Sequence, residues 1–100
     1  MAPAQVKIEW TERAIQDLRA AYDYWAEERS AAAAERMLET IFSAVEILES
    51  YPSAGRRGRV TGTRELVVLR TPFLIPYRVQ RGTIQILALL HGARKWPDRF

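Results

Sequence analysis

The sequence of 100 residues contains no cysteine, and this excludes disulfides, thiol catalysis and cysteine-based zinc sites. With one histidine and scattered carboxylates it also lacks a metal-ligand cluster, so we expect no metal and no other cofactor. Apolar runs are short, because the longest covers only residues 86–90 and cannot span a membrane. The first residues, Met1–Gln5, lack the basic and apolar pattern of a signal peptide, and we therefore expect a soluble, cytoplasmic protein.

Acidic residues are scarce in the second half of the chain. Residues 51–100 contain ten Lys or Arg, nine of them Arg, against only Glu65 and Asp98, whereas residues 1–50 contain five basic and ten acidic residues. The overall net charge of +3 therefore combines a half at −5 with a half at +8. Arginine suits planar, bidentate contacts with phosphate or carboxylate, so the basic half predicts an anionic partner, either nucleic acid or an acidic protein segment.

The first half predicts one strand and two helices. Residues 6–10 alternate apolar and polar side chains, which is typical of a half-buried strand. Apolar residues then recur at three- and four-residue steps after Thr11 and again after Ser30, and both residues are plausible N-caps. The second helix should stop near Tyr51, because Pro52 disfavours helical geometry in the residue before it. Two helices joined by a short polar link predict an antiparallel hairpin.

The second half predicts a loop followed by strands. Residues 53–62 contain three glycines and three arginines and are expected to form the main loop. Strands are expected at residues 65–69, 73–80 and 84–90, with a tight turn at Arg81-Gly82 between the last two. Pro76 cannot donate a ladder hydrogen bond, and it therefore predicts an edge strand, a bulge or a non-pairing direction at that point.

This order of elements, β-α-α-β-β-β, predicts a single α+β domain over residues 1–100. The N-terminal helical hairpin should pack on one face of a mostly antiparallel four-stranded sheet. Alternation of side chains along continuous strands places Arg78 and His91 on a common exposed face, provided that the register allows it.

Three segments of the second half carry a resemblance to a known family. They are Gly62-Thr63-Arg64-Glu65-Leu66, Tyr77-Arg78-Val79 and Leu90-His91-Gly92-Ala93-Arg94-Lys95-Trp96-Pro97. In this order and at this length, they resemble the RelE/ParE superfamily, the toxins of bacterial type II toxin–antitoxin modules, often labelled plasmid-stabilisation proteins. The resemblance extends over nearly the whole chain. It implies the small fold that the periodicity predicts, a growth-inhibiting activity and a cognate antitoxin as partner.

The superfamily implies two kinds of toxic action. RelE-like members are messenger RNA endoribonucleases that work in the ribosome, and their chemistry needs a base, an acid and cations around one phosphate. For that alternative the resemblance implies Arg78 and Arg94 as cations and His91 as acid or base, with Glu65 as a weaker candidate for the base. ParE-like members instead bind DNA gyrase and need no proton relay. We favour the ParE-like action, because several RelE-like nucleases end in a functional tyrosine and this chain ends in Phe100.

Binding of the target or of the antitoxin is expected at a set of basic residues: Arg56, Arg57, Arg59, Arg64 and Lys95. An acidic and apolar antitoxin tail would wrap the helical hairpin or cover the arginine-rich sheet. Operator DNA would be bound only through the antitoxin, and no membrane is expected as a partner. A non-toxic, basic RNA-binding module is the background alternative.

Plainer structural roles are also open to several of these residues. His91 at a strand end is more often a hydrogen-bonded structural residue than a catalyst. Tyr77 shares a face with apolar residues of its strand, so we expect a core role or an anchoring role for its hydroxyl. Glu65 is a candidate to pair with a basic side chain from an adjacent strand.

Overall fold

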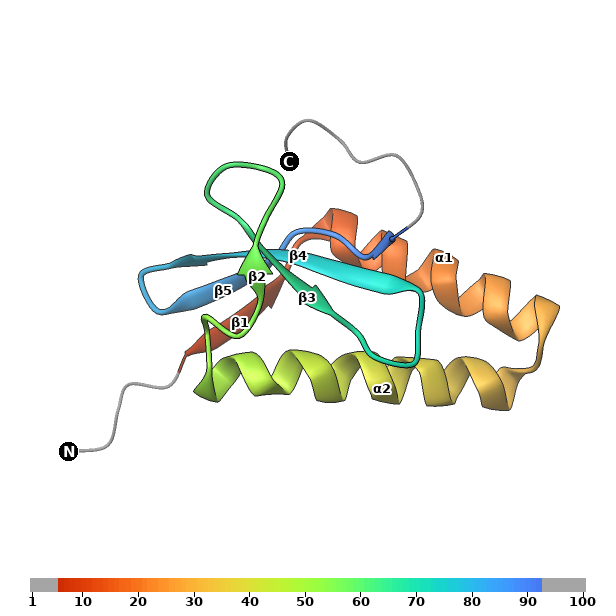
Figure 1. Ribbon diagram of the computed structural model, residues 1–100. Helices are drawn as coiled ribbons and strands as arrows, with labels where there is room; N and C mark the ends of the chain where they lie inside the picture. Colours follow the sequence, from red (N-terminus) through yellow and green to blue (C-terminus); the bar gives the residue numbers. More distant parts are fainter. Residues whose placement is uncertain (1–5, 93–100) are drawn as a thin grey trace.

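In the computed structural model, which describes residues 6–92, a helical hairpin lies on one face of a mixed sheet (Figure 1). The elements are β1 (Lys7–Trp10), α1 (Glu12–Glu28), α2 (Ala31–Ser50), β2 (Arg56–Arg57), β3 (Arg64–Val67), β4 (Phe73–Gln80), β5 (Thr83–Ile86) and β6 (Leu90–His91). The predicted α+β order is therefore confirmed. The sheet has two short strands more than expected, since β2 forms inside the predicted loop and β6 is separate from β5.

Both helices begin where their caps predict. The Thr11 hydroxyl accepts a hydrogen bond from the Ala14 amide at 3.2 Å, and the Ser30 hydroxyl accepts one from the Ala33 amide at 3.0 Å. The second helix ends at Ser50, and its C-cap is Tyr51, the residue before Pro52. Its buried face consists of Ala34, Met37, Ile41, Val45 and Leu48. Within residues 6–92, no helix is both long and apolar enough to cross a membrane.

The sheet has the order β1-β5-β4-β3-β2, and β6 pairs with β4 beyond the end of β5. Only β1 and β5 are parallel among the described pairs, and the other pairs are antiparallel. The core lies between the helices and the face of the sheet that carries Phe73, Ile75 and Tyr77 of β4. Figure 1 shows the loop between β2 and β3 extending from the sheet on the side opposite α2.

Pro76 interrupts the pairing between β4 and the chain that returns along it. The Pro76 carbonyl accepts a hydrogen bond from the Leu87 amide at 2.9 Å, but proline has no amide hydrogen to donate back. Residues 87–89 leave the strand at this point, so the predicted continuous strand over residues 84–90 is wrong. The predicted bulge, one of three alternatives for Pro76, is what the structure contains.

The bulge changes the register by one residue. Tyr77 pairs with Ile86, and the next pair along β4 joins Leu74 to Leu90. Two residues of β4 therefore face three residues of the returning chain, which is the definition of a bulge. A one-residue shift moves every later side chain to the opposite face of the sheet. The faces of β6 are consequently the reverse of those that an unbroken strand would have.

Helix α1 satisfies the backbone of the bulged segment. The Thr11 hydroxyl donates to the Ile86 carbonyl at 2.8 Å, with the Leu87 carbonyl at 3.2 Å. One Asp17 carboxylate oxygen accepts a hydrogen bond from the Leu89 amide at 3.1 Å. Leu87 and Leu89 are buried, and buried backbone groups that have left a ladder need such partners. Helix α1 and its N-cap residue therefore provide hydrogen-bond partners on both sides of the bulge.

Candidate functional site

Arg78 and His91 do not share an exposed face of the sheet, because the register on which that prediction depended is not the one that the structure has. Arg78 pairs with Gln85 and lies on the face away from the helices. His91 pairs with Phe73 on the helix-facing side, and the two rings meet edge to face with centroids 6.3 Å apart. The physical reason is the bulge, because its extra residue reverses the alternation before His91 is reached.

Glu65 is a buried carboxylate that holds the arginine-rich loop on the face away from the helices. Its side chain is 1% exposed, and one oxygen lies 3.1 Å from Nη2 and 3.2 Å from Nε of Arg56. The other oxygen accepts a hydrogen bond from the Arg59 amide at 2.7 Å, with the Arg59 Nε at 4.0 Å. The side chains of Arg56 and Arg59 remain more than half exposed. Glu65 therefore pairs with basic residues of the adjacent β2 and its loop, as its structural alternative predicts.

Tyr77 anchors the start of the same loop from the helix-facing side of the sheet. Its hydroxyl donates to the Pro52 carbonyl at 2.7 Å and accepts from the Gly55 amide at 2.8 Å. A Cβ at Gly55 would lie 2.6 Å from the Tyr77 ring, so the close approach requires glycine. The Arg64 guanidinium donates to the Gly55 carbonyl at 2.9 Å. Tyr77 is fully buried, in line with the core and anchoring roles expected for it.

The ionisation of Tyr77 gives this anchor a pH dependence. Burial raises the pKa of its hydroxyl, and the Gly55 hydrogen bond and the Arg64 charge only partly oppose this. Because the folded-state pKa lies above the unfolded value of about 10, the contribution to stability is complete below pH 10 and is lost as pH rises through the folded value. We expect urea unfolding at a series of alkaline pH values to show this loss. In the Tyr77→Phe variant, the part of this alkaline decrease in unfolding free energy that comes from Tyr77 should be absent. In the Tyr24→Phe variant it should still be present.

The predicted basic residues do not form one compact cluster. Arg56 and Arg59 surround Glu65 on one side of the sheet, and Arg57 pairs with Arg64 on the other. Arg94 and Lys95 lie outside the described residues, as does Phe100. Within residues 6–92, no group of three or more His, Cys, Asp or Glu side chains is arranged to hold a metal ion.

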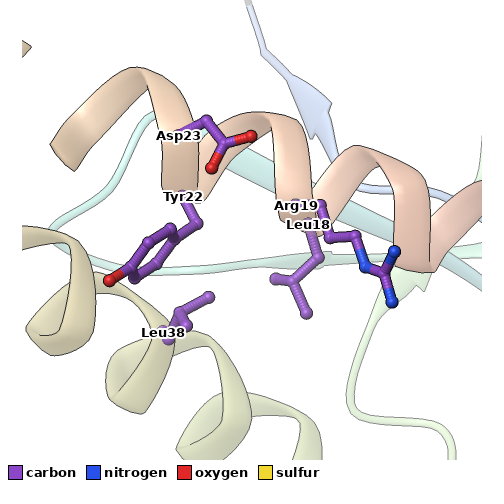
Figure 2. Close-up of a pocket in the computed structure, with 5 residues that line it drawn as sticks. All are labelled: Leu18, Arg19, Tyr22, Asp23 and Leu38. Carbon is purple, nitrogen blue, oxygen red and sulfur yellow. The ribbon is translucent and has the colours of Figure 1, made fainter. Parts of the chain in front are cut away.

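A shallow hollow of about 240 Å³ lies between the two helices. Figure 2 shows Leu18 and Tyr22 of α1 directed toward Leu38 of α2, while the Arg19 side chain extends away from them. The walls of this hollow are mainly apolar side chains, which also pack between the two helices of the hairpin. The hollow offers no set of convergent polar groups, and we assign it no chemistry.

A larger groove of about 1020 Å³ lies between α1 and the two segments 70–73 and 89–91. Its lining includes aromatic side chains, several charged ones and His91. Sequence reasoning did not identify this groove, because its walls come from segments far apart in the chain. Arg70 lies in the turn between two predicted strands, and its backbone is left-handed (φ 69°). Glycine or asparagine usually marks such a conformation in a sequence, so an arginine gave no signal of it.

Comparisons with known proteins agree with the fold. A family model described as the ParE toxin of the type II toxin–antitoxin system parDE matches residues 8–96. The chain is 41% identical over 92 residues to the Y4kP protein of Sinorhizobium fredii, covering 92% of this chain and 94% of that one. It is 40% identical over 88 residues to the toxin RelE2 of Caulobacter vibrioides, covering 88% of this chain and 97% of that one.

Solved structures give the same picture. A chain of the chromosomal ParDE toxin–antitoxin system of P. aeruginosa is 33% identical, with a TM-score of 0.79 over 85% of this chain and 94% of that one. A chain of the YoeB dimer from Staphylococcus aureus is 15% identical, with a TM-score of 0.57 over 85% of this chain and 94% of that one. The second likeness concerns the fold alone.

Proposed function

We propose that this chain, which belongs to the ParE family of toxins from type II toxin–antitoxin systems, arrests bacterial growth by binding DNA gyrase. Type II toxins are partnered by a cognate antitoxin, and in this proposal the antitoxin neutralises the chain. The family model and the ParDE chain at 33% identity support a ParE-like action over a RelE-like one.

The observation that carries this proposal is the separation of Arg78, His91 and Glu65, the described residues named for the cation, acid and base of a RelE-like nuclease. A ribonuclease of the RelE type needs an acid, a base and a cation around one phosphate. Arg78 and His91 lie on opposite faces of the sheet, and the carboxylate of Glu65 is buried against Arg56 and the Arg59 amide. The described residues therefore do not bring an acid, a base and a cation together around one point. A toxin that acts by binding does not need such a set.

A RelE-like ribonuclease is the second candidate, because the chain is 40% identical to a protein named toxin RelE2. The two candidates differ in the effect of losing the histidine. Removal of a general acid or base costs about two or more orders of magnitude in rate. His91→Ala should therefore lower a RelE-like activity about a hundredfold or more, whereas the gyrase proposal does not depend on that imidazole.

The test compares two activities of the purified chain. We expect inhibition of DNA supercoiling by gyrase, and no cleavage of messenger RNA in translating ribosomes. In cells, expression without the antitoxin should arrest growth and induce the DNA damage response. Codon-phased messenger cleavage with unaffected supercoiling would replace the gyrase proposal by the RelE-like one. Harmless accumulation of the folded chain would contradict both and favour the RNA-binding alternative.

A further inference from the structure

The hairpin of β2 and β3 leaves the sheet as a two-stranded ribbon, and we call residues 56–65 the β2–β3 ribbon. The pairing of β3 with β4 ends at Arg64 and Tyr77. The pairing of β3 with β2 continues outward, because the Gly58 amide donates to the Thr63 carbonyl at 2.8 Å. In the described part of the chain no third strand lies beside this end of the ribbon, and its loop extends from the sheet (Figure 1).

Hydrogen bonds fix the conformation of the ribbon, although none of its residues belongs to the hydrophobic core. The Val60 carbonyl accepts from the Thr63 hydroxyl at 2.6 Å and from the Thr63 amide at 3.1 Å. A Cβ at Gly58 would lie 2.8 Å from the Thr63 carbonyl oxygen, so this close approach requires glycine. The buried Glu65 carboxylate accepts from the Arg59 amide. A segment ordered in this way can bind a partner with little further loss of conformational entropy.

Arginines lie on both faces of the ribbon. Arg56 and Arg59 contact Glu65 on the face away from the helices, and Arg57 lies directly opposite Arg64 on the other face. Glu65 makes both ion pairs of the ribbon, and no carboxylate of residues 6–92 pairs with Arg57 or Arg64. Like charges that face each other across two strands destabilise the pair. An anion bound beside Arg57 would relieve this repulsion.

A thin ribbon with cations on both faces fits a groove with anionic walls. A flat acidic surface can contact one face at a time, whereas a nucleic-acid groove has phosphates along both walls. The major groove of B-form DNA is about 12 Å wide and admits a two-stranded β-ribbon, but that of A-form RNA is too narrow for side chains to read. The ribbon has no aromatic residue to stack on a base, and its one carboxylate, Glu65, is buried. Phosphates are therefore the groups that it can bind.

We propose that the β2–β3 ribbon binds in the major groove of duplex DNA, with Arg56 and Arg59 toward one wall and Arg57 toward the other. Glu65 is a positioning residue in this contact, because it holds Arg56 and the Arg59 amide. The role of the contact rests on the proposed function, since the DNA in question is the duplex that gyrase supercoils. The toxin then touches the enzyme and its DNA together. Phosphate contacts carry no sequence information, so this inference adds no recognition of operator DNA.

The experiment compares two variants that each remove one exposed charge from the basic half of the chain. Arg57→Gln changes the ribbon, and Arg81→Gln changes the turn between β4 and β5. The probe is a short fluorescent DNA duplex of random sequence, titrated with the purified full-length chain over a series of salt concentrations. We expect Arg57→Gln to weaken binding about tenfold at low salt and to lower the slope of log affinity against log salt by about one. Arg81→Gln should leave both unchanged.

Two further measurements accompany the titration. Arg57→Gln should unfold at no lower temperature than the wild type, because it removes a repulsive neighbour of Arg64. It should also inhibit supercoiling by gyrase less than Arg81→Gln does. Equal DNA affinities of the two variants would overturn the proposal. So would wild-type binding to an RNA duplex that is as tight as binding to DNA, because the charge alone would then account for it.

A third result would assign the ribbon to a different partner. If Arg57→Gln weakened binding to DNA-free gyrase but not to the duplex, the ribbon would contact an acidic protein surface, and the DNA proposal would be wrong. Inhibition of supercoiling by the wild-type chain would leave the proposed function standing in all these cases. Binding of DNA through the ribbon without inhibition of gyrase would instead contradict the proposed function and support the groove contact.

Discussion

Glu65→Ala is expected to lower the free energy of unfolding by about 2–3 kcal/mol, because it removes a buried carboxylate that has three donors around it. The loss stays below the largest values for broken buried ion pairs, since the arginines are more than half exposed and water can solvate them. Urea unfolding measures the change. Hydrogen exchange at the Arg59 amide should also accelerate strongly, because that amide loses its acceptor.

The matched control for this prediction is Glu46→Ala, which makes the same charge change on the exposed side of α2. We expect its effect to stay within about 0.5 kcal/mol, as for most surface substitutions. Glu65→Gln should fall between the two, because an amide oxygen can still accept from the Arg59 amide but carries no charge. Equal stability of the Glu65→Ala and Glu46→Ala variants would mean that the carboxylate does not hold the loop.

Tyr77→Phe is expected to cost about 2–4 kcal/mol of unfolding free energy, although it removes a single oxygen atom. The hydroxyl has two partners, and both are left without it: the Pro52 carbonyl at 2.7 Å and the Gly55 amide at 2.8 Å. A backbone group that is buried and unpaired pays its full desolvation penalty. Equilibrium unfolding in urea gives the magnitude, and exchange of the Gly55 amide reports the local effect.

Tyr24→Phe is the control for this second prediction, because Tyr24 is 62% exposed and its hydroxyl can be solvated by water. Its effect should lie within about 0.5 kcal/mol. If Tyr77→Phe were equally mild, water would have to replace the hydroxyl between β4 and the loop. In that case the anchor would not set the position of residues 52–55.

The helices and their caps could be predicted because their signals are local. Thr11 and Ser30 cap the helix that directly follows each of them, and the apolar period shows which face is buried. The short strands β2 and β6 could not be predicted in the same way. Each contains two residues and exists only because another strand lies beside it. Such pairing is a property of the assembled sheet rather than of the segment.

The candidate site shows the same division. The residue types were visible, including the pairing of Glu65 with a basic side chain of an adjacent strand and the anchoring role of the Tyr77 hydroxyl. The grouping of Arg78 with His91 failed, because one proline produced a bulge and a one-residue shift reversed the faces. The groove around Arg29 and Arg70 was not visible at all, since its walls come from residues more than 40 positions apart.

By itself the sequence determined the charge segregation, the helical hairpin, the α+β order and the family resemblance, because composition and period depend on residues close in the chain. Only the tertiary structure decided which charges lie together. It placed Arg56 and Arg59 around Glu65, and it placed His91 on the helix-facing side in the groove beside α1. Register, bulges and long-range hydrogen bonds make these decisions, and they arise only when distant segments pack against one another.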